Sequence, residues 1–196
     1  MDLINRVKQI LVSPKTEWQT IDGENDSHVA VLTKYVLLLA AIPAVAAFIG
    51  YGIIGYSFMG YHAASIGLGI KHAIIQYISM VGGVYITALV INLLAENFGS
   101  KKDFDKAFSL VAYAYTPAFI GGIFNIYHST VILGTVASIY SLVLLYMGLV
   151  PMMKTPAEKR TSYFVVSLLV MIVSMFVLAM ILTPIIIGSA AASYRF

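Results

Sequence analysis

The chain has 196 residues, of which 60% are hydrophobic and 11% are charged, and its formal net charge is +3. A composition this apolar excludes an ordinary soluble domain and predicts an integral membrane protein. The sequence contains no cysteine, which excludes disulfide bonds and thiolate chemistry.

Residues 1–33 are predicted to form a cytoplasmic N-terminal segment. The first twelve residues have the period of an amphipathic helix, with polar side chains such as Arg6 and Lys8 on the face opposite the apolar stripe. The Ser13-Pro14 pair then favours the start of a second short helix, which carries Trp18. The stripe consists of Leu3, Ile4, Val7, Ile10 and Leu11.

Two interpretations of this amphipathic segment remain open from the sequence. Its helices lie in the cytoplasmic interface of the membrane, with the apolar stripe and the tryptophan buried among lipid. Alternatively, the stripe packs on the ends of the protein's own membrane helices.

Residues 34–196 are predicted to form one membrane domain, because five long apolar runs fill this part of the chain. Crossing a hydrocarbon layer of ~30 Å takes about 20 helical residues, and each run is long enough. The predicted fold class is therefore all-α: a polytopic bundle of five transmembrane helices preceded by short interfacial amphipathic helices. The runs are Lys34–Tyr56, Ala73–Leu94, Ala107–Ile126, Val131–Met152 and Tyr163–Ile187.

The positive charges predict the orientation of this bundle. Ten of the 12 lysines and arginines precede or begin the first run, or lie between the second and third or the fourth and fifth. Only Lys71 and Arg195 fall on the other side. The positive-inside rule then places the N-terminus in the cytoplasm and the C-terminus outside. Because the basic residues are explained in this way, we expect no nucleic-acid partner.

Three local features indicate how the helices pack. Small residues in the first, second and fourth runs, such as Gly50 and Gly134, allow close approach of helix backbones. The four residues 127–130 predict a tight hairpin between the third and fourth spans. Gly99 predicts the end of a helix, and Phe104 and Phe108 favour an interfacial turn that leads into the third span.

No residue pattern in the sequence indicates a catalytic site, and we expect no enzyme activity. No Asp, Glu, Lys or Arg lies in the middle of a span, where proton relays and ion-coupled carriers place them. Glu96 is interpreted as an exposed helix-end carboxylate near Lys101 or Lys102. No cofactor is expected, and the histidines predicted to face outward (His62, His72 and His128) match no metal-ligand spacing.

The segment 111–122 of the third span is the most distinctive. Pro117 removes a backbone hydrogen bond and bends the helix, which frees a carbonyl for a Tyr or Thr hydroxyl. Tyr113 lies four residues before the proline on the same helical face, whereas Tyr115 points elsewhere. This segment forms either a partly polar groove for a lipid or a partner helix, or a kink that only shapes the bundle.

The order of several motifs resembles the prokaryotic branch of the Yip family, whose name refers to interaction with Ypt/Rab GTPases. The segment 10–21, with Pro14 and Trp18, resembles the N-terminus of these proteins. Residues 98–117 resemble the family's central signature, and residues 139–149, followed by Lys159 and Arg160, resemble its fourth span and cytoplasmic loop.

The resemblance implies a non-enzymatic integral protein of the bacterial cytoplasmic (inner) membrane. The resemblance to prokaryotic relatives implies a fold but no established activity. The chain lacks the Asp-Leu-Tyr-Gly-Pro motif of eukaryotic relatives, because Asp2-Leu3 continues as Ile-Asn, so a role with Rab GTPases is not carried over.

Two functions follow as hypotheses. The first is a scaffold or interaction protein that recruits a protein partner or organises membrane lipids at the cytoplasmic face, with formation of a homo-oligomer also open. The second is a small transporter or channel for a lipid-like or neutral solute, running past Pro43, Pro117 and Pro184. The candidate binding residues are Trp18, Phe104, Phe108, Tyr113, Tyr115 and Pro117.

Overall fold

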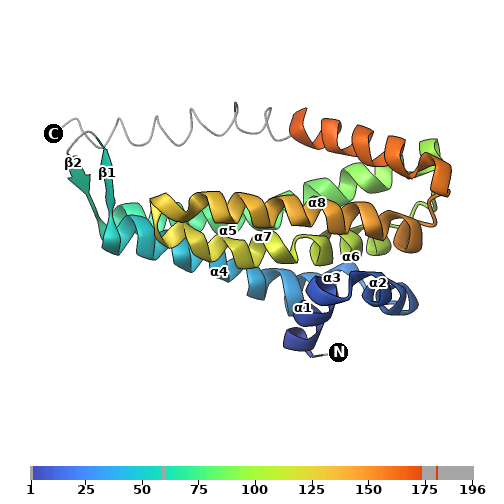
Figure 1. The fold of residues 1–196 in the computed structure, drawn as a ribbon, viewed down its shortest axis with the longest axis horizontal. Coiled ribbons are helices and arrows are strands. Elements are labelled where there is room, and N and C mark those ends of the chain that lie inside the picture. Colours follow the sequence, from blue (N-terminus) through green and yellow to red (C-terminus); the bar gives the residue numbers. More distant parts are fainter. Residues whose placement is uncertain (1, 59–60, 174–179, 181–196) are drawn as a thin grey trace.

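The computed structural model describes residues 2–58, 61–173 and 180. Within these ranges, four helices are long and apolar enough to cross a membrane: His28–Ile54, Ile66–Phe98, Phe104–Ile126 and Val131–Met153. They run side by side along the long axis of the molecule, and the N-terminal helices gather at one end (Figure 1). The prediction of a polytopic helical bundle is therefore confirmed.

The fifth predicted span is only partly covered. Residues 160–173 form a helix, and the remainder of the run Tyr163–Ile187 lies almost entirely outside the described residues, as does Pro184. This helix packs on the bundle, since Tyr163 is fully buried and its hydroxyl donates to the carbonyl of Ile91.

The N-terminal segment folds as helices α1 (Leu3–Val12) and α2 (Pro14–Gly23), which we call the N-terminal cap. The apolar side chains of Ile10, Trp18 and Ile21 are at most 2% exposed. Within the apolar stripe, Ile10 is buried and Leu3, Val7 and Leu11 are partly buried against the core, so most of the stripe packs on the protein itself, as the second interpretation of the sequence expects. Ile4 and Val12 remain exposed on α1.

The first span begins earlier than predicted and is not a uniform α-helix. Helix α3 (His28–Val31) continues through a π-helical segment (Leu32–Val36) into α4 (Leu37–Phe48), and a second π-helical segment (Ile49–Ile54) ends the span. Single π-helical turns inside α-helices often mark functional positions. Pro43 lies buried within α4.

A short antiparallel hairpin follows, formed by β1 (Tyr56–Phe58) and β2 (Tyr61–Ala63). It lies at the end of the bundle opposite the N-terminal cap (Figure 1). The all-α prediction did not contain these strands.

The second span is α5 (Ile66–Leu94), which closes in a 3-10 turn (Ala95–Phe98). Gly99 ends it with φ +67°, a left-handed conformation that glycine adopts without strain, and the predicted helix end is confirmed.

The third span is divided in two, into α6 (Phe104–Ala114) and α7 (Thr116–Gly121), followed by a 3-10 segment (Gly122–Ile126). A turn at Tyr115 separates the two helices, and Pro117 stands in the first turn of α7. The predicted bend is confirmed. Every residue of α6 from Ala107 to Ala114 is buried, so α6 forms the centre of the core.

The fourth span is α8 (Val131–Met153), and 3-10 turns of His128–Thr130 and Ala157–Lys159 flank it. The predicted tight hairpin is confirmed: a Cβ added at Gly121 would collide with Ala137 of α8. Gly50 similarly leaves no room for a side chain, because its Cβ would lie 2.5 Å from the carbonyl oxygen of Asn125. The small residues thus bring the helices together as expected.

Candidate functional site

A buried arginine ties the N-terminal cap to the bundle. Arg6 is 4% exposed, and its guanidinium donates to Glu17 and, at 2.5 Å, to Glu24. It also lies over the ring of Tyr113 in the core helix α6, with 5.2 Å between the guanidinium carbon and the ring centroid. The sequence placed Arg6 on the polar face of α1, opposite the apolar stripe, and did not predict that this side chain is buried. Only the later pair of acidic residues, Glu17 and Glu24, could have indicated a partner.

The electrostatics of this cluster favour the charged arginine. Burial alone would lower the pKa of Arg6, but the hydrogen bond and negative charge of Glu24, together with Glu17, raise it above its ordinary value. A buried cation is tolerated when it is paired and hydrogen-bonded, as it is here.

Tyr113 and Pro117 belong to a polar network at the break of the third span. The hydroxyl of Thr116 donates to the carbonyl oxygen of Tyr113 at 2.6 Å, so the carbonyl freed near the proline is satisfied as predicted. Tyr35, from the π-helical part of the first span, hydrogen-bonds Thr116 at 2.6 Å, and its ring meets that of Tyr113 edge to face at 4.7 Å.

Tyr115 lies on a different side of the same break, as the spacing indicated. Its hydroxyl hydrogen-bonds Thr87 of α5 at 3.0 Å. One residue past Pro117, the backbone N–H of Ala118 donates to Ser141 of α8 at 3.1 Å. The break in the third span is thus held from three neighbouring helices.

Phe104 and Phe108 form a third group, an aromatic cluster with His28 and Tyr85. His28 contacts Asp105 through both its backbone N–H (2.7 Å) and its ring Nδ1 (2.6 Å). Phe108 is fully buried and Phe104 is half-buried. The cluster joins the start of the first span to that of the third.

Trp18 is separate from these groups. It is 1% exposed and packs on α8, where a Cβ at Gly148 would lie 2.9 Å from its ring. Tyr115 and Phe104 are the only two of the six candidate residues that are not fully buried. The six therefore do not form one exposed binding surface.

Polar contacts on the same end of the molecule complete the attachment of the cap. Lys106 donates to the backbone carbonyls of Asp22 and Glu24, both at 2.6 Å, and Lys154 pairs with the Asp22 carboxylate at 2.5 Å. The hydroxyl of Tyr140 donates to the carbonyl of Leu11 at 2.8 Å. Every one of these contacts joins residues far apart in the sequence.

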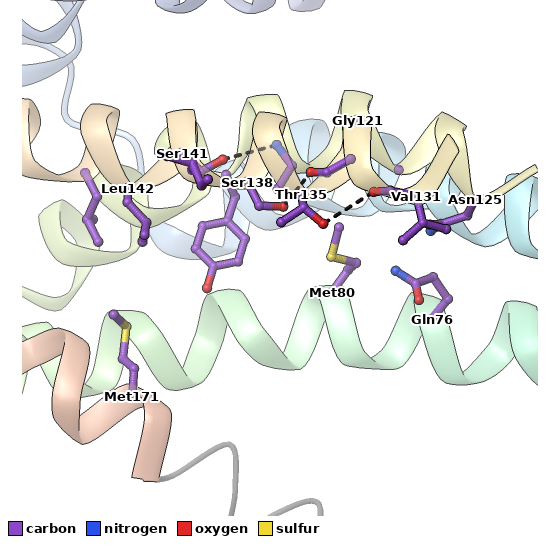
Figure 2. Close-up of a pocket in the computed structure, with 16 residues that line it drawn as sticks. Gln76, Met80, Gly121, Asn125, Val131, Thr135, Ser138, Ser141, Leu142 and Met171 are labelled. Carbon is purple, nitrogen blue, oxygen red and sulfur yellow. Dashed lines mark hydrogen bonds between the residues drawn. The ribbon is translucent and has the colours of Figure 1, made fainter. Parts of the chain in front are cut away.

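A membrane-level cavity of about 520 Å³ lies between α5, α7 and α8 (Figure 2). Hydroxyl groups of α8 line one side and bond within the protein: Thr135 and Ser138 donate to carbonyls of their own helix, and Ser141 accepts from Ala118. Gln76 points into the cavity from α5, toward Asn125. No protein hydrogen bond occupies either of these side-chain amides in the part of the chain that the structure describes, so both are available to a ligand.

Among the described residues, ionisable groups are scarce away from the end of the bundle that carries the N-terminal cap. Within the described ranges, no group of three or more His, Cys, Asp or Glu side chains could hold a metal ion. His72 stacks on Tyr51 at 3.8 Å. Glu96 is exposed and lies 3.8 Å from Lys102, which confirms its interpretation as a helix-end carboxylate.

The four long apolar helices and the cap on one end define a polytopic α-helical membrane protein. The Yip1 domain model matches residues 8–192, nearly the whole chain, and the chain belongs to this family. The predicted family and the predicted membrane location are therefore confirmed.

Two curated relatives support the assignment. The chain is 31% identical over 155 residues to the inner membrane protein YohC of Escherichia coli K12, covering 76% of this chain and 80% of the relative. The YohC protein of E. coli O6:H1 matches to the same extent. No solved structure matches the chain.

Proposed function

We propose that the protein is a non-enzymatic scaffold of a bacterial inner membrane, which recruits a protein partner or organises lipid at its cytoplasmic face. Family membership and the inner-membrane relatives support the membrane location. The proposal rests on one structural observation, the N-terminal cap. Its buried face is held by the Arg6 cluster, while its other face presents apolar side chains outward, with Ile4 73% and Val12 72% exposed.

Such a surface suits recruitment for a physical reason. A helix that is already folded and anchored loses little conformational entropy when a partner binds it. Apolar residues surrounded by polar ones are what a partner or the apolar boundary of the lipid headgroups would contact.

The topology that accompanies this function has five spans, a cytoplasmic N-terminus and an outside C-terminus. The helix 160–173, which lies in the fifth apolar run, supports the proposal of a fifth span. The backbone N–H of Lys101 donates to the carbonyl of Met153 at 2.8 Å, which brings two of the basic loops to the same end as the cap. Lys71 lies near the start of α5, far from that end.

Site-specific photo-crosslinking in native membranes tests the scaffold proposal. Probes replace Ile4 and Val12, and a probe at the fully buried Ile10 of the same helix is the matched control. We expect mass spectrometry to identify a foreign protein or lipid headgroups at the two exposed positions and not at the control. Equal yields at all three positions, or products of this chain with itself alone, would overturn the proposal.

A second candidate function is transport or binding of a lipid-like or neutral solute. The cavity between α5, α7 and α8 favours it, because the free amides of Gln76 and Asn125 lie at membrane depth without a charged neighbour in the lining. Uncharged donors and acceptors in an otherwise apolar wall suit an uncharged polar ligand.

Flux of uncharged solutes into liposomes that contain the purified protein tests this second candidate. We expect flux that falls in Gln76→Leu and is unchanged in Asn5→Leu, which removes an exposed amide of α1 that lines neither this cavity nor the one beside the cap. Flux equal to that of protein-free liposomes would exclude transport.

A further inference from the structure

A second cavity, of about 350 Å³, opens where the cap meets the cytoplasmic end of the bundle. Helix α2 contributes Lys15, Trp18 and Gln19, and Arg160 enters from the helix 160–173. The end of α8 supplies an apolar wall that includes Met147 and Val150. The cavity thus combines two cations with an apolar side, and no carboxylate lines it.

Neither of these two cations is neutralised by an acidic partner, a property that they share with Lys8, Lys34, Lys106 and Lys159 among the described residues. Among the described residues, Lys101, Lys102 and Lys154 pair with carboxylates, as does Arg6. No carboxylate in those same ranges pairs with Lys15 or Arg160. Their positive charge is therefore concentrated in one cavity and available to an anion.

Two buried hydrogen-bond donors in the wall also lack an acceptor. The indole Nε1 of Trp18 and the guanidinium Nε of Arg160 are shielded from solvent, and neither has a hydrogen-bond partner within the described parts of the chain. Buried donors in native proteins are nearly always satisfied, and each exception calls for an explanation. A ligand with several hydrogen-bond acceptors, bound in the cavity, would satisfy both donors.

The position of the arginine is fixed by packing rather than by an ion pair. Its guanidinium carbon lies 4.2 Å from the centroid of the Tyr146 ring on α8. The same side chain hydrogen-bonds the Tyr146 hydroxyl, which fixes the orientation of the guanidinium. A planar guanidinium has the fork geometry that phosphate oxygens accept.

We propose that this cavity binds a phosphate group, and that the group belongs to the headgroup of an anionic phospholipid of the inner membrane. Lys15 and Arg160 neutralise the phosphate, and the apolar wall of α8 contacts the glycerol and the upper acyl chains. The location supports a lipid source, because the cavity lies beside the last turns of a membrane-spanning helix. This inference rests on the proposed function, because it names the class of lipid that the scaffold would organise.

The chain reports on this cavity through its own fluorescence, because Trp18 is its only tryptophan. The full chain, purified in uncharged detergent, is titrated with dioleoylphosphatidylglycerol and, as a matched control, with dioleoylglycerol, which lacks the phosphate. We expect a saturable change in tryptophan emission with the phospholipid alone. No saturable change, or the same change with dioleoylglycerol, would overturn the proposal.

Charge-neutralising variants test the two cations. We expect Lys15→Gln and Arg160→Gln each to weaken the apparent affinity for the phospholipid about tenfold or more, because each removes charge-assisted hydrogen bonds. Lys8→Gln removes one charge from the same cap outside the cavity and should leave the affinity unchanged. Equal weakening by Lys8→Gln would overturn the site in favour of general attraction to the basic surface.

A parallel titration with inorganic phosphate distinguishes the two sources of the ligand. Saturation by the lipid at concentrations where inorganic phosphate has no effect supports a headgroup ligand. Saturation by inorganic phosphate alone would overturn the lipid source. The outcome is independent of crosslinking at Ile4 and Val12, which lie outside this cavity, so the two proposals fail separately.

Discussion

Arg6 illustrates how one charged side chain determines the arrangement of several segments. It contacts acidic residues in α2 and in the connection that follows it, and it also lies over a tyrosine of the core helix. Burial of an unpaired charge is strongly unfavourable, so each of these segments is stable in place only while the others are present.

Removal of the arginine is expected to destabilise the protein strongly. Arg6→Ala leaves Glu17, which is buried, without its cation, and breaking a buried pair costs about 3–5 kcal/mol. Lys8→Ala, an exposed change on the same helix, should cost less than about 0.5 kcal/mol. Thermal unfolding in detergent, followed by circular dichroism, measures both. Equal melting temperatures for the two variants would contradict the structural role of Arg6.

The hydroxyl of Thr116 is expected to matter because it serves two partners. Thr116→Val leaves the Tyr113 carbonyl and the Tyr35 hydroxyl without their hydrogen bonds, at a cost of about 1–3 kcal/mol. The control is Thr33→Val, because the exposed Thr33 hydroxyl bonds only within its own helix. Urea or detergent-denaturation midpoints should fall for the first variant and stay near the parent value for the second.

At the scale of secondary-structure elements, the contact between α2 and α8 depends on a missing side chain. The Trp18 ring occupies the space above Gly148 that any Cβ would fill. The glycine thus allows the cap to lie flat against the fourth span, as small residues do between membrane helices.

Overpacking at this contact should loosen the cap. Gly148→Ala places a methyl group 2.9 Å from the Trp18 ring and against Leu110, and overpacking of this kind costs about 1–3 kcal/mol. At Gly82 a Cβ would meet nothing within 4 Å, so Gly82→Ala is the control. Hydrogen–deuterium exchange of residues 3–23 should be faster in Gly148→Ala only. Unchanged exchange in both variants would contradict the contact.

The sequence predicted those structural features that depend only on residues close together in the chain. The bend near Pro117 follows from a missing N–H, the helix end at Gly99 from the freedom of glycine, and the hairpin at 127–130 from a connection too short for any other arrangement. Four spans also follow from length and apolarity alone.

What the sequence did not predict depends on contacts between distant residues. Helical periodicity placed Arg6 on the polar face of α1 but cannot reveal a partner on another element, and the partners of Arg6 lie 11 and 18 residues away. The burial of Trp18 depends on Gly148, which only the folded bundle brings beneath it. The sequence also did not predict that the six candidate residues divide among separate groups in the folded chain.

At the scale of the whole molecule, the two ends of the bundle differ in charge, and this difference predicts its orientation. Because the chain has no cysteine, single cysteines introduced at its surface can be labelled without background. Lys102→Cys lies in a basic loop, and Ser65→Cys lies at the start of α5; both positions are exposed.

Labelling with a membrane-impermeant maleimide in cells with a permeable outer layer checks the orientation. We expect Ser65→Cys to react in intact cells and Lys102→Cys to react only after the inner membrane is disrupted. Labelling of Lys102→Cys in intact cells would contradict the proposed topology.

The attachment of the cap also has a consequence for how the protein is made. Helices α1 and α2 leave the ribosome well before their partners are translated: Tyr140, whose hydroxyl donates to the Leu11 carbonyl, lies 129 residues further on. At about 5–20 residues per second, roughly 6–26 s of synthesis separate the two. Throughout that interval the apolar face of α1 and α2 has no α8 to cover it. Nascent chains stalled before α8 should therefore be cleaved by protease within residues 3–23, and chains stalled after its insertion should resist; equal cleavage would show that the cap closes without the fourth span.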